Sequence, residues 1–170
     1  LVLTILTFLG ATPSVHAQLF ITEVGADEPQ PEGNFEFVVL ENKSSGDVDL
    51  QGWQIDDNLG VLGSGAVISS SSFIISSGQF LVISEGANQT ALEAKWGPSI
   101  PTGNLFTTAS FNGMNNGSDD ARLTDNNDIS IDTLSYSGAT EGQSQTGSGA
   151  VDPFSTITAF TASVPVEWDA

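Results

Sequence analysis

The chain has 170 residues and is strongly acidic, with 21 Asp and Glu residues, three Lys and Arg residues and a formal net charge of −18. Nucleic-acid binding depends mainly on Lys and Arg displacing counterions from phosphates, so this composition argues against direct binding of DNA or RNA. A chain of this length can bury a sizeable core without disulfides, and since the sequence has no cysteine we expect one domain of ordinary size.

Residues 1–17, LVLTILTFLGATPSVHA, have the features of the last part of a secretory signal peptide. Their apolar run ends near Ala11 and is shorter than the roughly 20 residues that cross a bilayer. Small residues in Val15-His16-Ala17 suit cleavage before Gln18. We therefore predict a secreted or cell-surface protein whose mature chain has no membrane span. An extension upstream of Leu1 could instead turn the run into a membrane anchor.

Cleavage before Gln18 would remove His16, which is the one histidine of the sequence. The mature chain would then have neither imidazole nor thiol. Ser-His-Asp and Cys-His catalysis, and zinc or redox sites built on these groups, need a side chain that titrates or ligates near neutral pH. Only carboxylates remain as acid-base groups. We therefore predict that the protein is not an enzyme, and we assign no catalytic, cofactor-binding or metal-binding residue.

Alternating apolar and polar residues predict short, half-buried strands through the first half of the chain. In chain order the segments are LFITEV (19–24), FEFVVLEN (35–42), GWQID (52–56), AVIS (66–69), SFIIS (72–76) and QFLVIS (79–84). In the second segment, odd-numbered residues share one face and even-numbered residues the other. Glu36 and Glu41, considered as the carboxylate pair of a glycosidase, then lie on opposite faces, which argues against a shared cleft.

One helical connection is expected at NQTALEAKW, residues 88–96. Thr90 and Glu93 have the spacing of a capping box, and Gly97-Pro98 is a stop signal. Beyond it, a tight turn at 125–128 separates strands expected near 121–124 and 129–136. Short strands with regular turns and little helix predict an all-β, antiparallel β-sandwich.

Residues 146–170 are rich in Gly, Ser and Thr and are expected to form a C-terminal segment or linker. Part of this segment could lie on the sandwich through Phe154, Ile157 and Phe160. Its last residues, SVPVEWDA (163–170), resemble the Pro-Val-Glu-Trp stretch that precedes the sorting domain of proteins exported by type IX secretion. That resemblance implies a larger cell-surface or secreted protein.

Several segments follow one another in a distinctive order: LFITEV, FEFVVLENKSSGDVDLQGWQI, SGQFLVIS, NNGSDDARLTDNNDISIDTLSYS and EGQSQ. Together they closely resemble the lamin-tail domain of secreted bacterial proteins, in which an opening strand ends in Glu-Val and Asp-Leu-x-Gly-Trp precedes an apolar strand. The resemblance covers about residues 19–145. It implies an immunoglobulin-like β-sandwich over residues 18–145 without catalytic residues. A longer Gly/Ser-rich stretch between 55 and 79, and Phe37 in place of Trp or Tyr, depart from the family pattern.

Asp49, Gly52 and Trp53 are the motif residues with the clearest physical roles. A short carboxylate after a turn can accept backbone N–H bonds, and a glycine lets an adjacent indole pack against main chain. A large aromatic beside a strand turn usually buries its ring. The alternative makes Trp53 a platform for stacking sugars, and it requires an exposed ring.

Two Asx-rich turns, Asp56-Asp57-Asn58 and Asp125-x-Asn127-Asp128, could offer oxygen ligands to calcium. Neither turn has the twelve-residue EF-hand spacing or its closing Glu. Asx residues are also common in turns for backbone reasons alone. We therefore assign no cofactor and keep calcium as an alternative.

The basic residues are expected at the surface. Lys43 and Lys95 are most simply solvated charges. Arg122, which follows Asp119 and Asp120 closely, is most simply a surface ion-pair partner.

Three interpretations of function remain open. The first is a non-catalytic structural, adhesion or binding module of an exported protein, with a protein or a cell-surface polysaccharide as its partner. The second is an accessory domain of a larger extracellular hydrolase, such as a nuclease or phosphatase. The third is a calcium-dependent carbohydrate-binding module.

Overall fold

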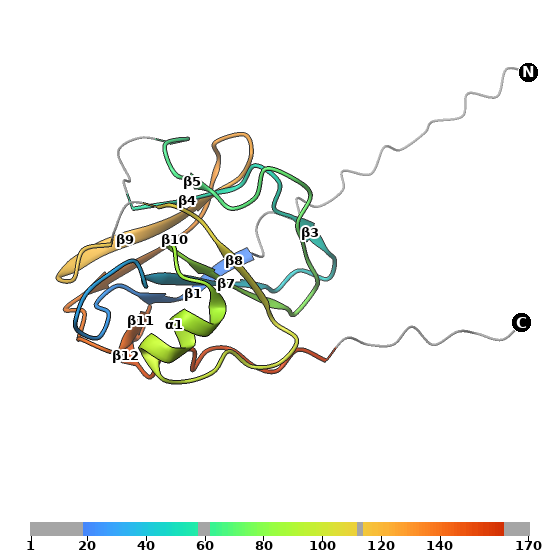
Figure 1. Cartoon of the computed structure of the whole chain (residues 1–170). Helices are drawn as coiled ribbons and strands as arrows, with labels where there is room; N and C mark the ends of the chain where they lie inside the picture. Colours follow the sequence, from blue (N-terminus) through green and yellow to red (C-terminus); the bar gives the residue numbers. More distant parts are fainter. Residues whose placement is uncertain (1–18, 58–61, 112–113, 162–170) are drawn as a thin grey trace, which may run out of the picture.

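The computed structural model describes residues 19–57, 62–111 and 114–161, in which strands form two stacked sheets with one helix beside them (Figure 1). The predicted signal peptide at 1–17 and the segment at 163–170 lie outside these residues. Within the described part of the chain, no helix is both long and apolar enough to span a membrane.

The larger sheet has six strands in the order β12-β11-β1-β2-β7-β8. The bounds are β1 Leu19–Gly25, β2 Phe37–Asn42, β7 Phe80–Ser84, β8 Leu105–Thr108, β11 Ser144–Thr146 and β12 Gly149–Val151. The predicted strands at 19–24, 35–42 and 79–84 are therefore confirmed. β8, β11 and β12 were not predicted, because their sequences lack a clear alternation.

The smaller sheet has four strands in the order β10-β9-β4-β5, and a separate two-stranded sheet pairs β3 with β6. The bounds are β3 Val48–Asp49, β4 Gln54–Asp56, β5 Ala66–Val67, β6 Ile74–Ile75, β9 Ser118–Thr124 and β10 Ser130–Ser137. The architecture is a mostly antiparallel, immunoglobulin-like β-sandwich, as the sequence predicts. The exception is the pair β7 and β8, which is parallel.

The parallel pair follows from the helix. Parallel neighbours cannot be joined by a hairpin and need a long crossover, and α1, Gln89–Trp96, lies in the connection between β7 and β8. Figure 1 shows α1 beside the larger sheet, with the C-terminal segment passing close to it. The predicted helical connection is thus confirmed, and its role is to carry the chain across one face of the sheet.

Two hydrophobic cores result from this arrangement. Val38 and Leu40 of β2 belong to the core between the two sheets. Phe37 and Val39 belong to a second core on the outer face, which also contains Leu92 and Trp96 of α1 with Phe154 and Ile157 of the C-terminal segment. The prediction of half-buried strands is therefore wrong for β2 and β7, because α1 and the C-terminal segment cover their second face.

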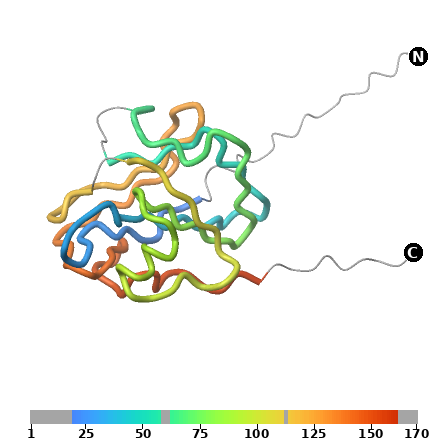
Figure 2. Tube along the Cα trace, in the orientation of Figure 1, coloured from blue at the N-terminus to red at the C-terminus, as the bar shows by residue number. Residues whose placement is uncertain are grey.

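The C-terminal segment contributes directly to the second core. The Phe154 ring lies 4.7 Å from the Phe37 ring, measured between centroids. Phe160 is partly exposed, and its backbone N–H donates to Thr102 O at 3.2 Å. Figure 2 shows this segment beside the connection that follows α1. The packed part of the chain thus continues past residue 145, where the change in composition places the start of a linker.

The helix begins differently from the predicted capping box. Asn88 is the N-cap, and its Oδ1 accepts a hydrogen bond from Ala91 N at 3.0 Å. Glu93 instead accepts hydrogen bonds from Gln89 Nε2 and Ile100 N, each at 2.9 Å. Gly97 ends the helix as predicted, since it adopts φ 101° and its N–H donates to Glu93 O. The Thr90 cap is therefore wrong by two residues.

Asn88→Ala should lower the free energy of unfolding by about 1 kcal/mol, because the Ala91 N–H loses its acceptor. Thr90→Ala is the matched control and should change stability by no more than about 0.5 kcal/mol, since Thr90 is exposed. Urea unfolding of both variants measures the difference. A larger loss of stability in Thr90→Ala than in Asn88→Ala would contradict this result and support the predicted capping box at Thr90.

Candidate functional site

Trp53, the most prominent residue of the sequence motif, lies in the core between the sheets. Its side chain is only 2% exposed and shares this core with Ile55 and Leu50. Trp53 and Ile55 thus lie on one face, as the alternation in GWQID (52–56) predicts. The sugar-stacking alternative is wrong for this residue, because stacking needs an exposed ring.

Asp49 organises the chain around Trp53. Its Oδ1 accepts hydrogen bonds from Phe73 N at 2.9 Å and Gln51 N at 3.1 Å, and its Oδ2 accepts one from Ser72 Oγ at 2.8 Å. The bond from the Phe73 N–H, followed by that from Ser72, holds the pKa of Asp49 below its usual value. The predicted role of Asp49 as an acceptor of backbone N–H bonds is confirmed.

Gly52 has a conformational role that the sequence did not reveal. Its φ is 77°, a left-handed conformation that glycine adopts at little cost. A Cβ atom built at this position would lie 3.1 Å from the Cβ of Asn126, which brings the 125–128 turn close to the motif. We therefore attribute the presence of glycine at position 52 mainly to its positive φ and to the close approach of Asn126.

Asn42 closes the preceding strand and is fully buried. Its Oδ1 accepts hydrogen bonds from Ser44 N at 2.9 Å and Ser44 Oγ at 2.6 Å. Its Nδ2 donates to Gly46 O and Ile75 O, each at 2.9 Å. The oxygen and the nitrogen of the Asn42 amide thus together connect the turn after β2 to β6.

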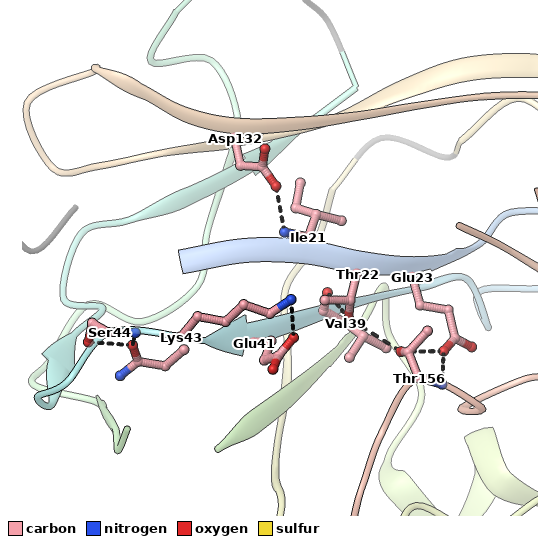
Figure 3. Close-up of polar contacts among 10 residues, drawn as sticks. Ile21, Thr22, Glu23, Val39, Glu41, Lys43, Ser44, Asp132 and Thr156 are labelled. Carbon is pink, nitrogen blue, oxygen red and sulfur yellow. Dashed lines mark hydrogen bonds and ion pairs between the residues drawn. The ribbon is translucent and has the colours of Figure 1, made fainter. Parts of the chain in front are cut away.

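Glu23 is a buried carboxylate whose role sequence reasoning missed. Its Oε1 accepts hydrogen bonds from Ser144 Oγ at 2.6 Å and Phe154 N at 2.5 Å. Its Oε2 accepts bonds from Thr156 Oγ1 at 2.7 Å and Thr156 N at 3.1 Å (Figure 3). The sequence indicated a special role for this residue only through the Glu-Val pair that ends the opening strand of the family pattern. Glu23 attaches the C-terminal segment to the centre of the larger sheet.

The register of β1 is irregular just before Glu23, the residue that holds the C-terminal segment. The register of β1 against β2 shifts between Ile21 and Glu23, so that Thr22 is an extra residue. At the same point Ile21 N donates to Asp132 Oδ2 of β10 at 2.7 Å, and Figure 3 shows Asp132 reaching Ile21 from the other sheet. The carboxylates of Asp132 and Glu23 thus bind β1 to two different parts of the fold.

A family model described as Lamin Tail Domain matches residues 12–138. The chain belongs to the lamin tail domain family. This family consists of immunoglobulin-like, non-catalytic modules, in agreement with the sandwich and with the structural use of the motif residues. A search of curated proteins found no match.

The two glutamates considered as a glycosidase pair are not brought together in this lamin tail domain. Glu36 lies just before β2, and its Oε2 accepts a hydrogen bond from Met114 N at 2.5 Å. Glu41 forms an ion pair with Lys43 at 3.0 Å. Burial raises the pKa of Glu36 to about 8, so this carboxyl group is mainly protonated at neutral pH.

The first proposed calcium turn is used for other contacts. Asp56 is buried, and its Oδ2 lies 2.8 Å from Arg122 Nη2 and accepts a hydrogen bond from Ser64 Oγ at 2.9 Å. Burial is the main cause of the raised pKa of Asp57. Asn58 lies outside the described residues.

The second proposed calcium turn is an Asx turn. Asp125 Oδ1 accepts backbone hydrogen bonds from Asn127 N at 2.8 Å and Ile129 N at 2.9 Å. Asp128 adopts φ 60°, and its Oδ1 accepts a bond from Gln54 Nε2 at 3.3 Å. Across residues 19–57, 62–111 and 114–161, no three His, Asp or Glu side chains are grouped so that they could hold a metal ion.

The surface position predicted for Arg122 is wrong. The residue is only 3% exposed and is paired with Asp56, which is 66 residues away in the sequence. Asp120 Oδ1 instead accepts a hydrogen bond from Ser135 Oγ, and Asp119 Oδ2 accepts one from Asn115 N. The closeness of Arg122 to the two aspartates in the sequence therefore did not identify its ion-pair partner. The pairing of β4 with β9 places Asp56 opposite Arg122 instead.

The two lysines are more than solvated charges. Lys43 pairs with Glu41 and lies over the Phe20 ring, 5.4 Å from its centroid. Lys95 donates to Pro31 O and lies 5.3 Å from the centroid of the Phe35 ring. Each ammonium group thus covers an aromatic ring at the surface of the sandwich.

Proposed function

We propose that this lamin tail domain is a non-catalytic structural or binding module of an exported, cell-surface or secreted protein. The observation that carries the proposal is the use of the motif side chains. Glu23, Asn42, Asp49 and Trp53 are buried or occupied by hydrogen bonds within the domain. The role of each of these side chains is to stabilise the fold rather than to position a substrate.

Export is supported by the sequence of residues 1–17, which has the features of a signal peptide. The net charge of −18 favours solubility outside the cell. The acidic surface favours partners that carry positive charge or neutral hydrogen-bonding groups. A protein surface or a cell-surface polysaccharide fits this description.

A combined binding and turnover screen of the purified full-length chain tests the proposal. Immobilised protein is exposed to glycans and cell-surface polymers with and without calcium, and the same preparation is assayed against glycosides, phosphomonoesters and nucleic acids. We expect saturable retention of one class of ligand and no turnover. Turnover that is lost in Glu36→Gln but kept in the matched variant Glu41→Gln would overturn the non-catalytic assignment.

A further inference from the structure

β8 is the outermost strand of the larger sheet and carries no charged side chain. It pairs with β7 on one side, and in the described part of the chain no strand lies along its other side. The strand reads Leu105-Phe106-Thr107-Thr108, and residues 96–118 around it contain no Asp, Glu, Lys or Arg. In a chain with a net charge of −18, a second molecule therefore meets no charge from this strand or from its flanking segments.

One side of the β8 backbone is available for further hydrogen bonds. Ala109 N donates to Ser84 O at 2.9 Å, so the backbone groups of Ala109 face β7. Alternate residues of a strand point their N–H and C=O groups to the same side, so Thr107 also faces β7, while Phe106 and Thr108 face away from it. Among the residues that the structure describes, the outward N–H and C=O groups of Phe106 and Thr108 have no partner.

The other outer strands have features that keep further strands away. β10 contains Asp132, and its register against β9 shifts between Ser130 and Asp132. β5 and β12 are only two and three residues long. A charge, an irregular register and a short length are common protections of sheet edges. β8 has neither a charge nor an irregularity, because its register with β7 is continuous over all of its residues.

The apolar side chains of β8 are only half-buried. Leu105 packs against the core between the sheets, and Phe106 packs against the second core on the outer face. A strand paired along the outer side of β8 would cover more of both side chains. Pairing there would therefore add burial of apolar surface to the new backbone hydrogen bonds.

We propose that β8 pairs with β8 of a second copy of this chain, antiparallel and about a two-fold axis at Thr107. Phe106 of each copy then lies opposite Thr108 of the other, and each of these two pairs exchanges two N–H···O bonds. A register centred on Phe106 would need the Asn104 N–H, which already donates to Pro101 O. A second copy fits because a two-fold axis satisfies the same free groups in both molecules, and because neither strand brings a charge to the contact.

Salt has a defined effect on this dimer. Each copy carries a net charge of −18, so the rest of the two molecules repel each other. Added salt screens that repulsion, whereas the hydrogen bonds between the two β8 strands involve no charged group. The dimer should therefore strengthen several-fold as sodium chloride is added, which is the opposite of an association held by ion pairs.

Sedimentation equilibrium of the full chain over a range of concentrations tests the proposal, using wild type, Thr108→Pro and the matched control Thr108→Ala. Proline removes the outward N–H of residue 108 but no hydrogen bond to β7, and edge strands tolerate proline in this position. We expect dimerisation to weaken by about tenfold or more in Thr108→Pro, because two of the four hydrogen bonds are lost. Thr108→Ala keeps the N–H and should stay within about threefold of wild type.

A single cysteine gives a second readout if Thr108→Pro fails to fold, since the chain has no cysteine of its own. The two copies of residue 107 form a pair without hydrogen bonds, with Cα atoms about 4.5 Å apart, which allows a disulfide. Mild oxidation should therefore link Thr107→Cys into a covalent dimer and leave Thr133→Cys, exposed on β10, monomeric. A wild type that stays monomeric would leave this edge to a strand of another protein and overturn the proposal. Equal dimerisation of wild type and a folded Thr108→Pro, or equal cross-linking of the two cysteine variants, would overturn it as well.

Discussion

Glu23→Ala is expected to lower the free energy of unfolding by about 3 to 5 kcal/mol. The carboxylate accepts four hydrogen bonds from Ser144, Phe154 and Thr156. Its removal leaves the Phe154 N–H buried without an acceptor. The C-terminal segment would then lose its attachment to β1, and the Phe154 ring its fixed place against Phe37.

Urea unfolding followed by tryptophan fluorescence measures this loss, because Trp96 also packs against Phe37. Glu23→Gln should fall between wild type and Ala, since an amide keeps one acceptor oxygen. Glu41→Ala, on the same sheet but partly exposed, should cost no more than about 1 kcal/mol. A loss below about 1 kcal/mol in Glu23→Ala would show that the segment is held by apolar contacts alone.

Trp53→Ala is expected to lower the free energy of unfolding by about 3 to 5 kcal/mol, because the indole is buried and leaves a large cavity between the sheets. Phe20→Ala is the matched control: its ring is exposed, and its loss should cost about 1 kcal/mol or less. Thermal and urea unfolding both report the difference. A variant that kept wild-type stability but lost binding to a glycan would instead make Trp53 a ligand contact.

Local patterns in the sequence were sufficient for the first half of the sandwich. The alternation of apolar and polar residues predicted β1, β2 and β7. The turn residues around Asp49 and Gly52 predicted the turn that precedes Trp53. The alternation also set Glu36 and Glu41 on different faces. These features depend on a strand's own period and on short-range backbone bonds, which a sequence displays directly.

Contacts between distant parts of the chain were beyond sequence reasoning. Arg122 is buried because β4 brings Asp56 beside it. β11 forms because it pairs with β1, where Glu23 also accepts a hydrogen bond from Ser144, and β12 pairs in turn with β11. Phe154 and Ile157, which follow, pack on the outer face of β2. Each of these depends on topology, which composition and period do not encode.

Hydrogen exchange of three amides gives the most direct test of the claim that the motif side chains serve the fold. Ser44 N donates to Asn42 Oδ1, and Phe154 N and Thr156 N donate to the Glu23 carboxylate. The account predicts that all three exchange with free energies close to that of global unfolding. Exchange at the rates of an open loop, in a chain whose β2 and β7 amides stay protected, would contradict it.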